Sequence, residues 1–352
     1  MADPVKSLQA WFRANARPLP WRVEPRDPYR VLVSELMLQQ TQVDRVIPKY
    51  ELFTAAFPDL ASLAAATQEE VLTLRSGLGY YRRARLLHRL ARQGVEEGGR
   101  LPCTAAELQR LPGVGPYTAA AVSSLVHGEE IPVLDGNVMR VASRFLAFPG
   151  DPRRSEGRGV LTTWLEGLLV GGSPGEINEA LMELGATVCL PRAPGCDRCP
   201  LGPGCAAHAD GCPEAYPPPR QRREVVHLRW VAACCIDEAG RWLVRRVDEG
   251  PILRGLWLPP MAPLAPDEDG ADVAQRLVAG SHTTSVRILD EVLHSITHRR
   301  IRVVPVRLSV SGRGTGGQEG RWIDPENSAL PTSSLFGKLI KTNNITMNEE
   351  NE

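Results

Sequence analysis

The sequence predicts two domains of different class, a mainly α region followed by a smaller α+β region. Residues 1 to about 210 repeat apolar side chains at spacings of three and four, as in "VKSLQAWF" and "VLVSELMLQQ", which is typical of helices with one buried face. Beyond about residue 224 the pattern changes to strand-like runs such as "HLRWVAACCID" and "IRVVPVRLSV". A chain of 352 residues also exceeds one typical core. We therefore expect a helical domain at 1–211 and a second domain at 225–341.

Two Asp-Pro pairs mark helix starts in the first domain. Asp3-Pro4 and Asp27-Pro28 each join an aspartate, which caps helices well, to a proline, which suits the first helical position. The later stretches "AELQRL" and "NEALMELGA" keep the helical spacing. Helices are therefore expected throughout this domain.

A proline-rich, basic stretch, "PEAYPPPRQRR", separates the two regions, and we place a linker at 212–224. In the second domain "RWLVRRV" and "VRILDEVLHSI" predict further strands, and "DVAQRLVAG" predicts a helix. The polar tail at 342–352 is typical of a disordered segment. These elements together predict an α+β domain.

Composition bears on location and partners. No run of about 18 apolar residues occurs, and the first residues lack the apolar stretch and cleavage site of a secretory signal, so we expect a cytoplasmic protein with no membrane partner. The formal net charge of zero neither requires nor excludes a nucleic-acid partner. Nearly all positive charge is arginine, and no lysine lies between Lys49 and Lys338.

Five of the eight cysteines fall between Cys189 and Cys212, which favours a metal site over disulfides in a reducing compartment. Four have the spacing C-x6-C-x2-C-x5-C, close enough for their thiolates to converge on one metal centre: Cys189, Cys196, Cys199 and Cys205. Zinc is the alternative to an iron-sulfur cluster, although structural zinc sites usually contain a second C-x2-C pair or paired histidines, and neither occurs here. We expect Cys103, Cys234 and Cys235 to pack in the interior.

A glycine-rich loop, "LPGVGPYT", precedes a predicted helix at 116. Gly113 and Gly115 can bring backbone N–H groups close to an anion, and Pro116 suits the first helical position. A helix N-terminus adds partial positive charge, so such a loop can hold a phosphate without a basic side chain. The alternative is an ordinary turn between two helices.

The cysteine spacing resembles the iron-sulfur motif of the endonuclease III superfamily of DNA glycosylases, and the glycine loop resembles the helix-hairpin-helix element of that superfamily. Further stretches resemble the adenine-specific mismatch glycosylases, the MutY family: "LPWR" at 19–22, "SELMLQQTQV" at 34–43, "GLGYYRRAR" at 77–85, "VLDGNVMRV" at 133–141 and "NEALMELGA" at 178–186. With the linker and "GLWLPP", the resemblance covers nearly the whole chain.

This resemblance implies a helix-hairpin-helix glycosylase fold for 1–211, with a 4Fe-4S cluster held by the four cysteines. It implies that the protein binds double-stranded DNA, flips adenine paired with 8-oxoguanine or guanine, and removes it to leave an abasic site. We expect a monomer that acts on the nucleoid of a bacterial cell.

Breaking an N-glycosidic bond requires protonation of the leaving base and stabilisation of a positive sugar, which favours two carboxylates in different environments. Glu35 lies on a predicted helix where its neighbours three and four residues away are Val31, Leu32, Leu38 and Gln39, and an unpaired carboxylate is costly on such a face. An exposed structural glutamate is the alternative. The resemblance implies that Glu35 is the acid at the adenine ring nitrogen.

Asp135, in "LDGNVMRVASRF", fits the N-cap of a helix at least as well as a catalytic role. The resemblance implies that its carboxylate stabilises the positive sugar and that Asn137 supports it. Related bifunctional enzymes carry a lysine at the position of Tyr117, and its amine attacks the sugar. Because residue 117 is tyrosine and no lysine is nearby in the sequence, we expect a monofunctional glycosylase in which Tyr117 positions the sugar or Asp135.

The target base must leave the helical stack, and the gap must be filled. By resemblance, Gln40 and Tyr80 wedge into the duplex beside the orphan base, and Leu78 is a further DNA contact. Arg22 and Glu179 match positions of the adenine pocket. The alternatives are a buried aromatic in a turn for Tyr80 and simple helix packing for Glu179.

The stretch "GRWLVRRVDEGPILRGLWLPP" resembles the Nudix-like module with which MutY proteins recognise 8-oxoguanine. The glutamates of a catalytic Nudix box do not follow, so this module should bind rather than hydrolyse. Where the family has Phe-Ser-His, this chain has Ile296, Thr297 and His298. The resemblance implies that Thr297 and His298 contact the lesion without the aromatic wedge.

Two other functions compete with this interpretation. A thymine or uracil mismatch glycosylase, or a bifunctional glycosylase-lyase, would use the same scaffold. A non-enzymatic iron-sulfur DNA-binding module would need neither Glu35 nor Asp135.

Overall fold

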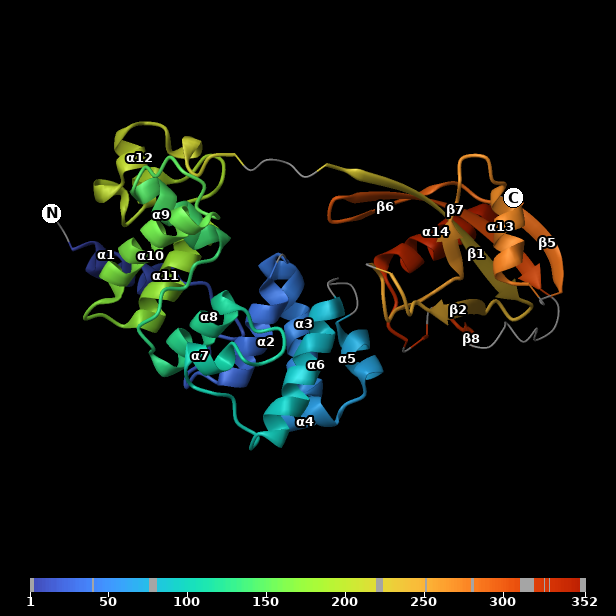
Figure 1. Cartoon of the computed structure of the whole chain (residues 1–352), viewed down its shortest axis with the longest axis horizontal. Coiled ribbons are helices and arrows are strands. Elements are labelled where there is room, and N and C mark those ends of the chain that lie inside the picture. The colour runs from blue at the N-terminus through green and yellow to red at the C-terminus, as the bar shows by residue number, and fades with distance from the viewer. Residues whose placement is uncertain are drawn as a thin grey trace. The chain divides into compact units, whose positions relative to one another are not determined.

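The computed structural model describes residues 3–39, 41–75, 81–219, 224–250, 252–279, 282–310, 320–325, 327–328 and 330–348. The chain forms two compact units (Figure 1). The first comprises Met1–Ala65 and Leu86–Gln221, and the second comprises Ala66–Arg85 and Arg222–Glu352. Within the described ranges no helix combines the length and apolar character needed to cross a membrane.

The first unit is helical, as predicted. Its helices are α1 (Pro4–Asn15), α2 (Pro28–Leu38), α3 (Val43–Ala56), α4 (Leu60–Ala65), most of α6 (Tyr81–Glu96), α7 (Ala105–Leu108), α8 (Pro116–His127), α9 (Gly136–Phe145), α10 (Ser155–Leu169), α11 (Pro174–Thr187) and the short α12 (Ala206–Ala209). Both predicted helix starts are confirmed, because Asp3 and Asp27 accept backbone N–H bonds as N-caps and a proline follows each of them. The sequence pattern therefore located these helices by their caps as well as by their apolar spacing.

The helix α11 lies at the centre of this unit and packs against α1, α8 and α9. Ile177, Ala180, Leu181 and Leu184 of α11 are fully buried. A small residue lets α9 approach, because a Cβ on Gly185 would lie 2.6 Å from the Cβ of Asn137. This close packing holds the start of α9 against α11.

The second unit contains a sheet with the strand order β3-β2-β1-β7-β5. Its strands are β1 (Val226–Asp237), β2 (Trp242–Arg246), β3 (Trp257–Leu258), β4 (Met261–Pro263), β5 (Thr283–Ile288), β6 (Val292–Ile296), β7 (Arg299–Val310) and β8 (Gly320–Ile323). The strands β1 and β7 run parallel over twelve paired residues, while β6 pairs antiparallel with β7. Its helices are α5 (Gln68–Leu74), α13 (Gly270–Leu277) and α14 (Ser334–Asn348). The predicted α+β class is confirmed for this region.

Two apolar layers cover the sheet, and one of them was not expected. Val273 and Ala274 of α13 pack on one face, and Leu335, Phe336 and Leu339 of α14 pack on the other face. The expectation of a disordered tail from 342 was wrong up to residue 348, because the apolar residues of α14 anchor a helix that continues through Asn348. The burial expected for Cys234 and Cys235 is confirmed, but Cys103 is exposed.

Candidate active site

A cavity of about 520 Å³ in the first unit is lined by side chains from five helices, α2, α3, α8, α9 and α11, and from the segments that precede α2, α3 and α9. It brings together six residues predicted from the sequence: Arg22, Glu35, Tyr117, Asp135, Asn137 and Glu179. They come from positions as far apart as 22 and 179 in the chain, so only the fold makes them neighbours. The cavity therefore combines carboxylates, a phenol and arginines in one place.

Glu35 lies on α2, where every residue from Tyr29 to Met37 except Arg30 is buried. Its side chain lies at the cavity wall, and the residue is only 3% exposed. Burial raises the pKa of Glu35 to about 7, because the charged carboxylate loses its hydration. The nearby carboxylates of Asp135 and Glu179 act in the same direction, whereas Tyr117 and Arg22 oppose it. A carboxyl group that holds a proton near neutral pH is suited to act as a general acid.

Tyr117 lies in the first turn of α8 and donates a hydrogen bond from its hydroxyl to Oε2 of Glu35. Burial, together with the adjacent carboxylates of Glu35 and Asp135, raises the pKa of Tyr117 well above its usual value. The phenol therefore stays protonated and acts as a donor. Because it occupies Oε2, the other oxygen of Glu35 remains available for a proton to be donated into the cavity.

Asp135 is the N-cap of α9 and accepts a hydrogen bond of 2.6 Å from the backbone N–H of Val138. The predicted cap is therefore confirmed, and the same side chain lines the cavity. Burial raises the pKa of Asp135, while hydrogen bonds from Val138 and Asn137 act to lower it. Asn137 itself accepts a 2.9 Å hydrogen bond from Arg140, whose guanidinium also donates to the carbonyl of Cys189. A single carboxylate thus serves as both cap and cavity group.

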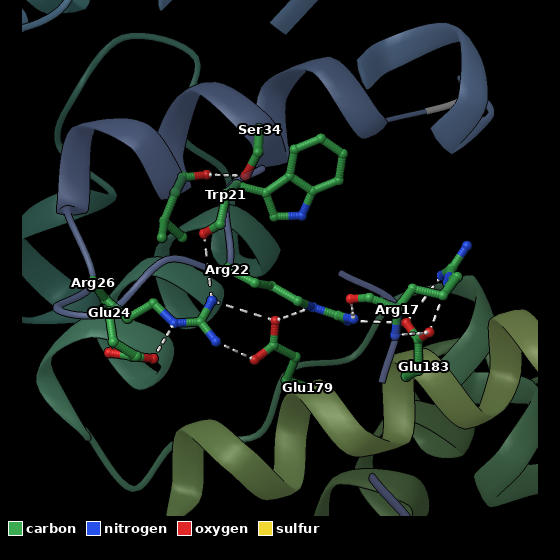
Figure 2. Close-up of polar contacts among 9 residues, drawn as sticks. Arg17, Trp21, Arg22, Glu24, Arg26, Ser34, Glu179 and Glu183 are labelled. Carbon is green, nitrogen blue, oxygen red and sulfur yellow. Dashed lines mark hydrogen bonds and ion pairs between the residues drawn. The ribbon is translucent and has the colours of Figure 1, made fainter. Parts of the chain in front are cut away.

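An arginine-glutamate network forms one wall of the cavity. Figure 2 shows Arg22 between the carboxylates of Glu179 and Glu183, at 2.7 Å and 2.9 Å. Arg26 also binds Glu179, at 2.7 Å, and Arg17 binds Glu183, at 2.6 Å. Despite the opposing effect of burial, the bonds from Arg17 and Arg22 lower the pKa of Glu183.

Sequence reasoning missed Arg17, Arg26 and Glu183 as members of this network. One available signal was the spacing of Glu179 and Glu183, which are four residues apart on α11 and so lie on one helix face. Glu183 is 1% exposed, and buried carboxylates are rare unless they are paired. The network fixes Glu179 as an acceptor of hydrogen bonds at the cavity wall.

The glycine loop leads into α8, as predicted. Gly113 has a φ of +83°, and a Cβ there would lie 2.7 Å from Cβ of Leu86, so this position requires glycine. Gly115 is the N-cap of α8 with Pro116 in the first turn, and both glycines are exposed. Backbone N–H groups at the start of this helix therefore face solvent, where they are able to bind an anion.

The four cysteines of the predicted cluster line one small cavity with Arg144 and Phe145 of α9. Arg144 donates a 3.3 Å hydrogen bond to Sγ of Cys189 and is itself only 2% exposed. Burial, with the three neighbouring thiols, raises the pKa of Cys199 to about 11. Among the described residues, no three histidine, cysteine or carboxylate side chains are grouped tightly enough to hold one metal ion. The four thiols therefore share the lining of one small cavity.

In the second unit, Thr297 and His298 form the two-residue turn between β6 and β7. Thr297 has a φ of +55°, which is unusual for a β-branched residue. Its exposed hydroxyl lies 3.3 Å from Nδ1 of His298. The remaining predicted DNA contacts, Gln40, Leu78 and Tyr80, lie outside the described residues.

The chain is similar to proteins of known function along most of its length. The family described as "HhH-GPD superfamily base excision DNA repair protein" matches residues 33–166. Adenine DNA glycosylase of Rattus norvegicus is 34% identical, and the match covers 93% of this chain and 76% of that protein. Adenine DNA glycosylase of Homo sapiens is 35% identical over 95% of this chain and 72% of that protein.

Among solved structures, a thermostable thymine-DNA glycosylase is 30% identical with a TM-score of 0.53. That match covers 58% of this chain and 95% of the solved chain. A helical glycosylase fold is therefore shared with an enzyme that is named for a different base.

Proposed function

The chain belongs to the adenine DNA glycosylase family, and from this premise we propose that it hydrolyses the N-glycosidic bond of adenine mispaired in duplex DNA. The reaction belongs to base excision repair and leaves an abasic site. The observation that carries the proposal is the placement of Glu35, which holds a proton near pH 7 at the wall of a cavity shared with Asp135.

We assign the proton transfer to Glu35. The protonated carboxyl donates to a ring nitrogen of adenine as the bond to the sugar lengthens, which makes the base a neutral leaving group. Tyr117 holds Oε2 by its hydrogen bond, which fixes the orientation of the acid. After the base has left, the resulting carboxylate accepts a proton from the attacking water.

Asp135 is assigned to the positive charge that develops on the sugar. A fixed negative charge close to an oxocarbenium-like sugar stabilises the transition state more than the ground state. The N-cap bonds from the start of α9 favour the charged form of Asp135 against the effect of burial. Asn137 keeps this carboxylate in place.

Glu179 and Arg22 are assigned to recognition of the base. Glu179 is held by two arginines and its carboxylate oxygens accept hydrogen bonds, so it suits the exocyclic amine of adenine. Thymine presents a carbonyl oxygen at the corresponding position of its major-groove edge. The network therefore favours adenine over thymine.

The described residues that line the cavity offer no amine for covalent chemistry at the sugar. The cavity lining contains no lysine among the described residues, and the sequence has none between Lys49 and Lys338. A Schiff base with the sugar needs an amine nucleophile. We therefore assign a hydrolytic reaction without strand cleavage.

We further propose that Cys189, Cys196, Cys199 and Cys205 hold a 4Fe-4S cluster. All four thiols are half-buried, and burial raises the pKa of Cys196, Cys199 and Cys205, so thiolates at this site need the compensating charge that a cationic metal centre supplies. When bound, the cluster would brace the loop that carries these cysteines.

We also propose that the second unit is a Nudix-like module that recognises 8-oxoguanine opposite the adenine through Thr297 and His298. The exposed turn between β6 and β7 presents a hydroxyl and an imidazole, which are able to bond a purine edge. We expect the protein to act on DNA as a monomer in the cytoplasm, with Gln40, Leu78 and Tyr80 as further DNA contacts and the loop of Gly113 and Gly115 on a phosphate.

The proposed function is tested with four duplexes under single-turnover conditions. They carry adenine opposite 8-oxoguanine, guanine or thymine, and thymine opposite guanine. Base release and strand nicking are scored separately. We expect adenine release from the first two duplexes and no nick before alkali, whereas preferential release of thymine would contradict the proposal.

A further inference from the structure

One face of the sheet in the second unit changes from apolar to basic along the strands β1 and β7. Alternate residues of a strand lie on one face, and Val231 pairs with Val304 under α13. The preceding residues on the same face are Arg229, paired with Arg302, and His227, paired with Arg300. Figure 1 shows β6 at the end of the sheet away from α13. The face is therefore basic where the strands extend past that helix.

The strand β6 completes this surface, because Leu293 pairs with Arg302 and Ser295 pairs with Arg300. We call the surface the basic sheet face, and its members are all exposed: His227, Arg229, Leu293, Ser295, Arg300 and Arg302. The side chain of Arg302 is 64% exposed and lies 3.6 Å from Glu291. Nζ of Lys338 donates a 2.7 Å hydrogen bond to the carbonyl of Leu293 and adds another cation nearby.

The arrangement of charges is unfavourable for the sheet itself. Arg229 and Arg302 are directly opposite each other on neighbouring strands, and like charges in such pairs destabilise a sheet. The other face of the same strands carries the apolar residues Leu228, Ile301 and Val303 that form the core with α14. The arginines therefore contribute nothing to that core. An external anion bound between them would offset the repulsion between Arg229 and Arg302.

We propose that the basic sheet face binds the phosphate backbone of the DNA duplex. This inference rests on the proposed function only in that DNA is the substrate. Arg300 and Arg302 are two residues apart on one strand, so they lie about 7 Å from each other and are able to reach different phosphates. The turn of Thr297 and His298 joins β6 and β7, two of the strands that form the basic sheet face. The face therefore binds phosphates beside the base that this turn approaches.

The test measures how DNA affinity depends on salt. Each lost phosphate contact lowers the slope of log K against log salt by about 0.9. If all three arginines contact phosphates, the triple variant Arg229→Gln, Arg300→Gln and Arg302→Gln should have a slope lower by about 2.7, so its loss of affinity is about 40-fold greater at 50 mM salt than at 200 mM. The duplex is fully paired and contains no lesion, so recognition of 8-oxoguanine does not enter.

The control removes the same charge from exposed arginines elsewhere, through Arg154→Gln, Arg158→Gln and Arg276→Gln. The control variant should keep the wild-type rate of adenine release at saturating enzyme. Adenine release by the wild-type protein is measured alongside, which separates failure of this inference from failure of the proposed function. Glu291→Gln removes the only acid paired with the face among the described residues, so it should tighten binding at low salt, a gain that misfolding cannot produce. The proposal would be overturned if the triple variant of the basic sheet face had the same salt slope as the control variant, which is the result expected if the face binds an acidic protein. It would also be overturned if Glu291→Gln did not increase the affinity for DNA.

Discussion

The raised pKa of Glu35 predicts that the rate of adenine release falls as pH increases through about 7. The acid must be protonated to act, so activity follows the protonated fraction and is lost above the pKa. At pH 7 about half of the molecules would carry the proton, against about 0.3% for a carboxyl with the ordinary value of 4.5. Burial therefore increases the supply of active acid about 150-fold at neutral pH.

Two substitutions should move this falling limb in opposite directions. The hydrogen bond from Tyr117 favours the charged form of Glu35, so Tyr117→Phe should raise the pKa of Glu35 and shift the limb to higher pH. The charge of Asp135 disfavours the charged form, so Asp135→Asn should lower that pKa and shift the limb to lower pH. Asp135→Asn should also reduce the maximal rate, because the sugar loses its counter-charge.

The assay is single-turnover release of adenine at saturating enzyme between about pH 5.5 and 9, with Glu35→Gln as the reference. Glu35→Gln keeps the shape of the side chain but cannot donate the proton, so its rate should be lower by roughly a hundred- to ten-thousand-fold and should lack this limb. Binding to the duplex should be unchanged. Glu35→Gln within a few-fold of the wild type, or shifts of the same sign in the other two variants, would refute the assignment of Glu35 as the acid.

Three further predictions concern the cap, the nucleophile and the cluster. Asp135→Asn should leave the melting temperature nearly unchanged because asparagine also caps helices, whereas Asp135→Ala should cost about 1 kcal/mol of stability by thermal unfolding; equal losses would show that charge, not capping, stabilises α9. Borohydride added during the reaction should trap no enzyme-DNA adduct on gels, since Tyr117 offers no amine, and a robust adduct would contradict hydrolysis. Protein prepared without oxygen should be brown with about four irons per chain by metal analysis, and stoichiometric zinc would contradict an iron-sulfur cluster.

A further prediction uses the backbone of the turn between β6 and β7. Glycine adopts a positive φ without strain, so Thr297→Gly should stabilise the second unit by about 1 kcal/mol in denaturant unfolding. The same change removes the hydroxyl proposed to bond 8-oxoguanine, so the preference over guanine should decrease by about five-fold. Greater stability with unchanged preference would leave recognition to other groups.

Local sequence determined the elements of this protein and several chemical features. Asp27-Pro28 set the start of α2, the alternating residues after 224 predicted the strands, and the apolar neighbours of Glu35 indicated its burial. These features depend on residues three or four positions apart or on strict alternation, so short-range geometry is sufficient. The helix α14 was missed because its apolar residues are followed by a polar tail, and contact with the sheet stabilises it.

Only the tertiary structure decided which distant residues meet. In the sequence Glu183 is one more polar residue of a helix, yet it binds Arg17 and Arg22 from 166 and 161 positions away and is almost fully buried. The pKa of Glu35 near 7 depends on burial among packed helices and on Tyr117 and Asp135, which come from α8 and from the N-cap of α9. The basic sheet face requires the register of β1 against β7, which places Arg229 opposite Arg302. Burial and Coulomb interactions depend on distances in space, and a chain fixes those distances only when its helices and strands have packed.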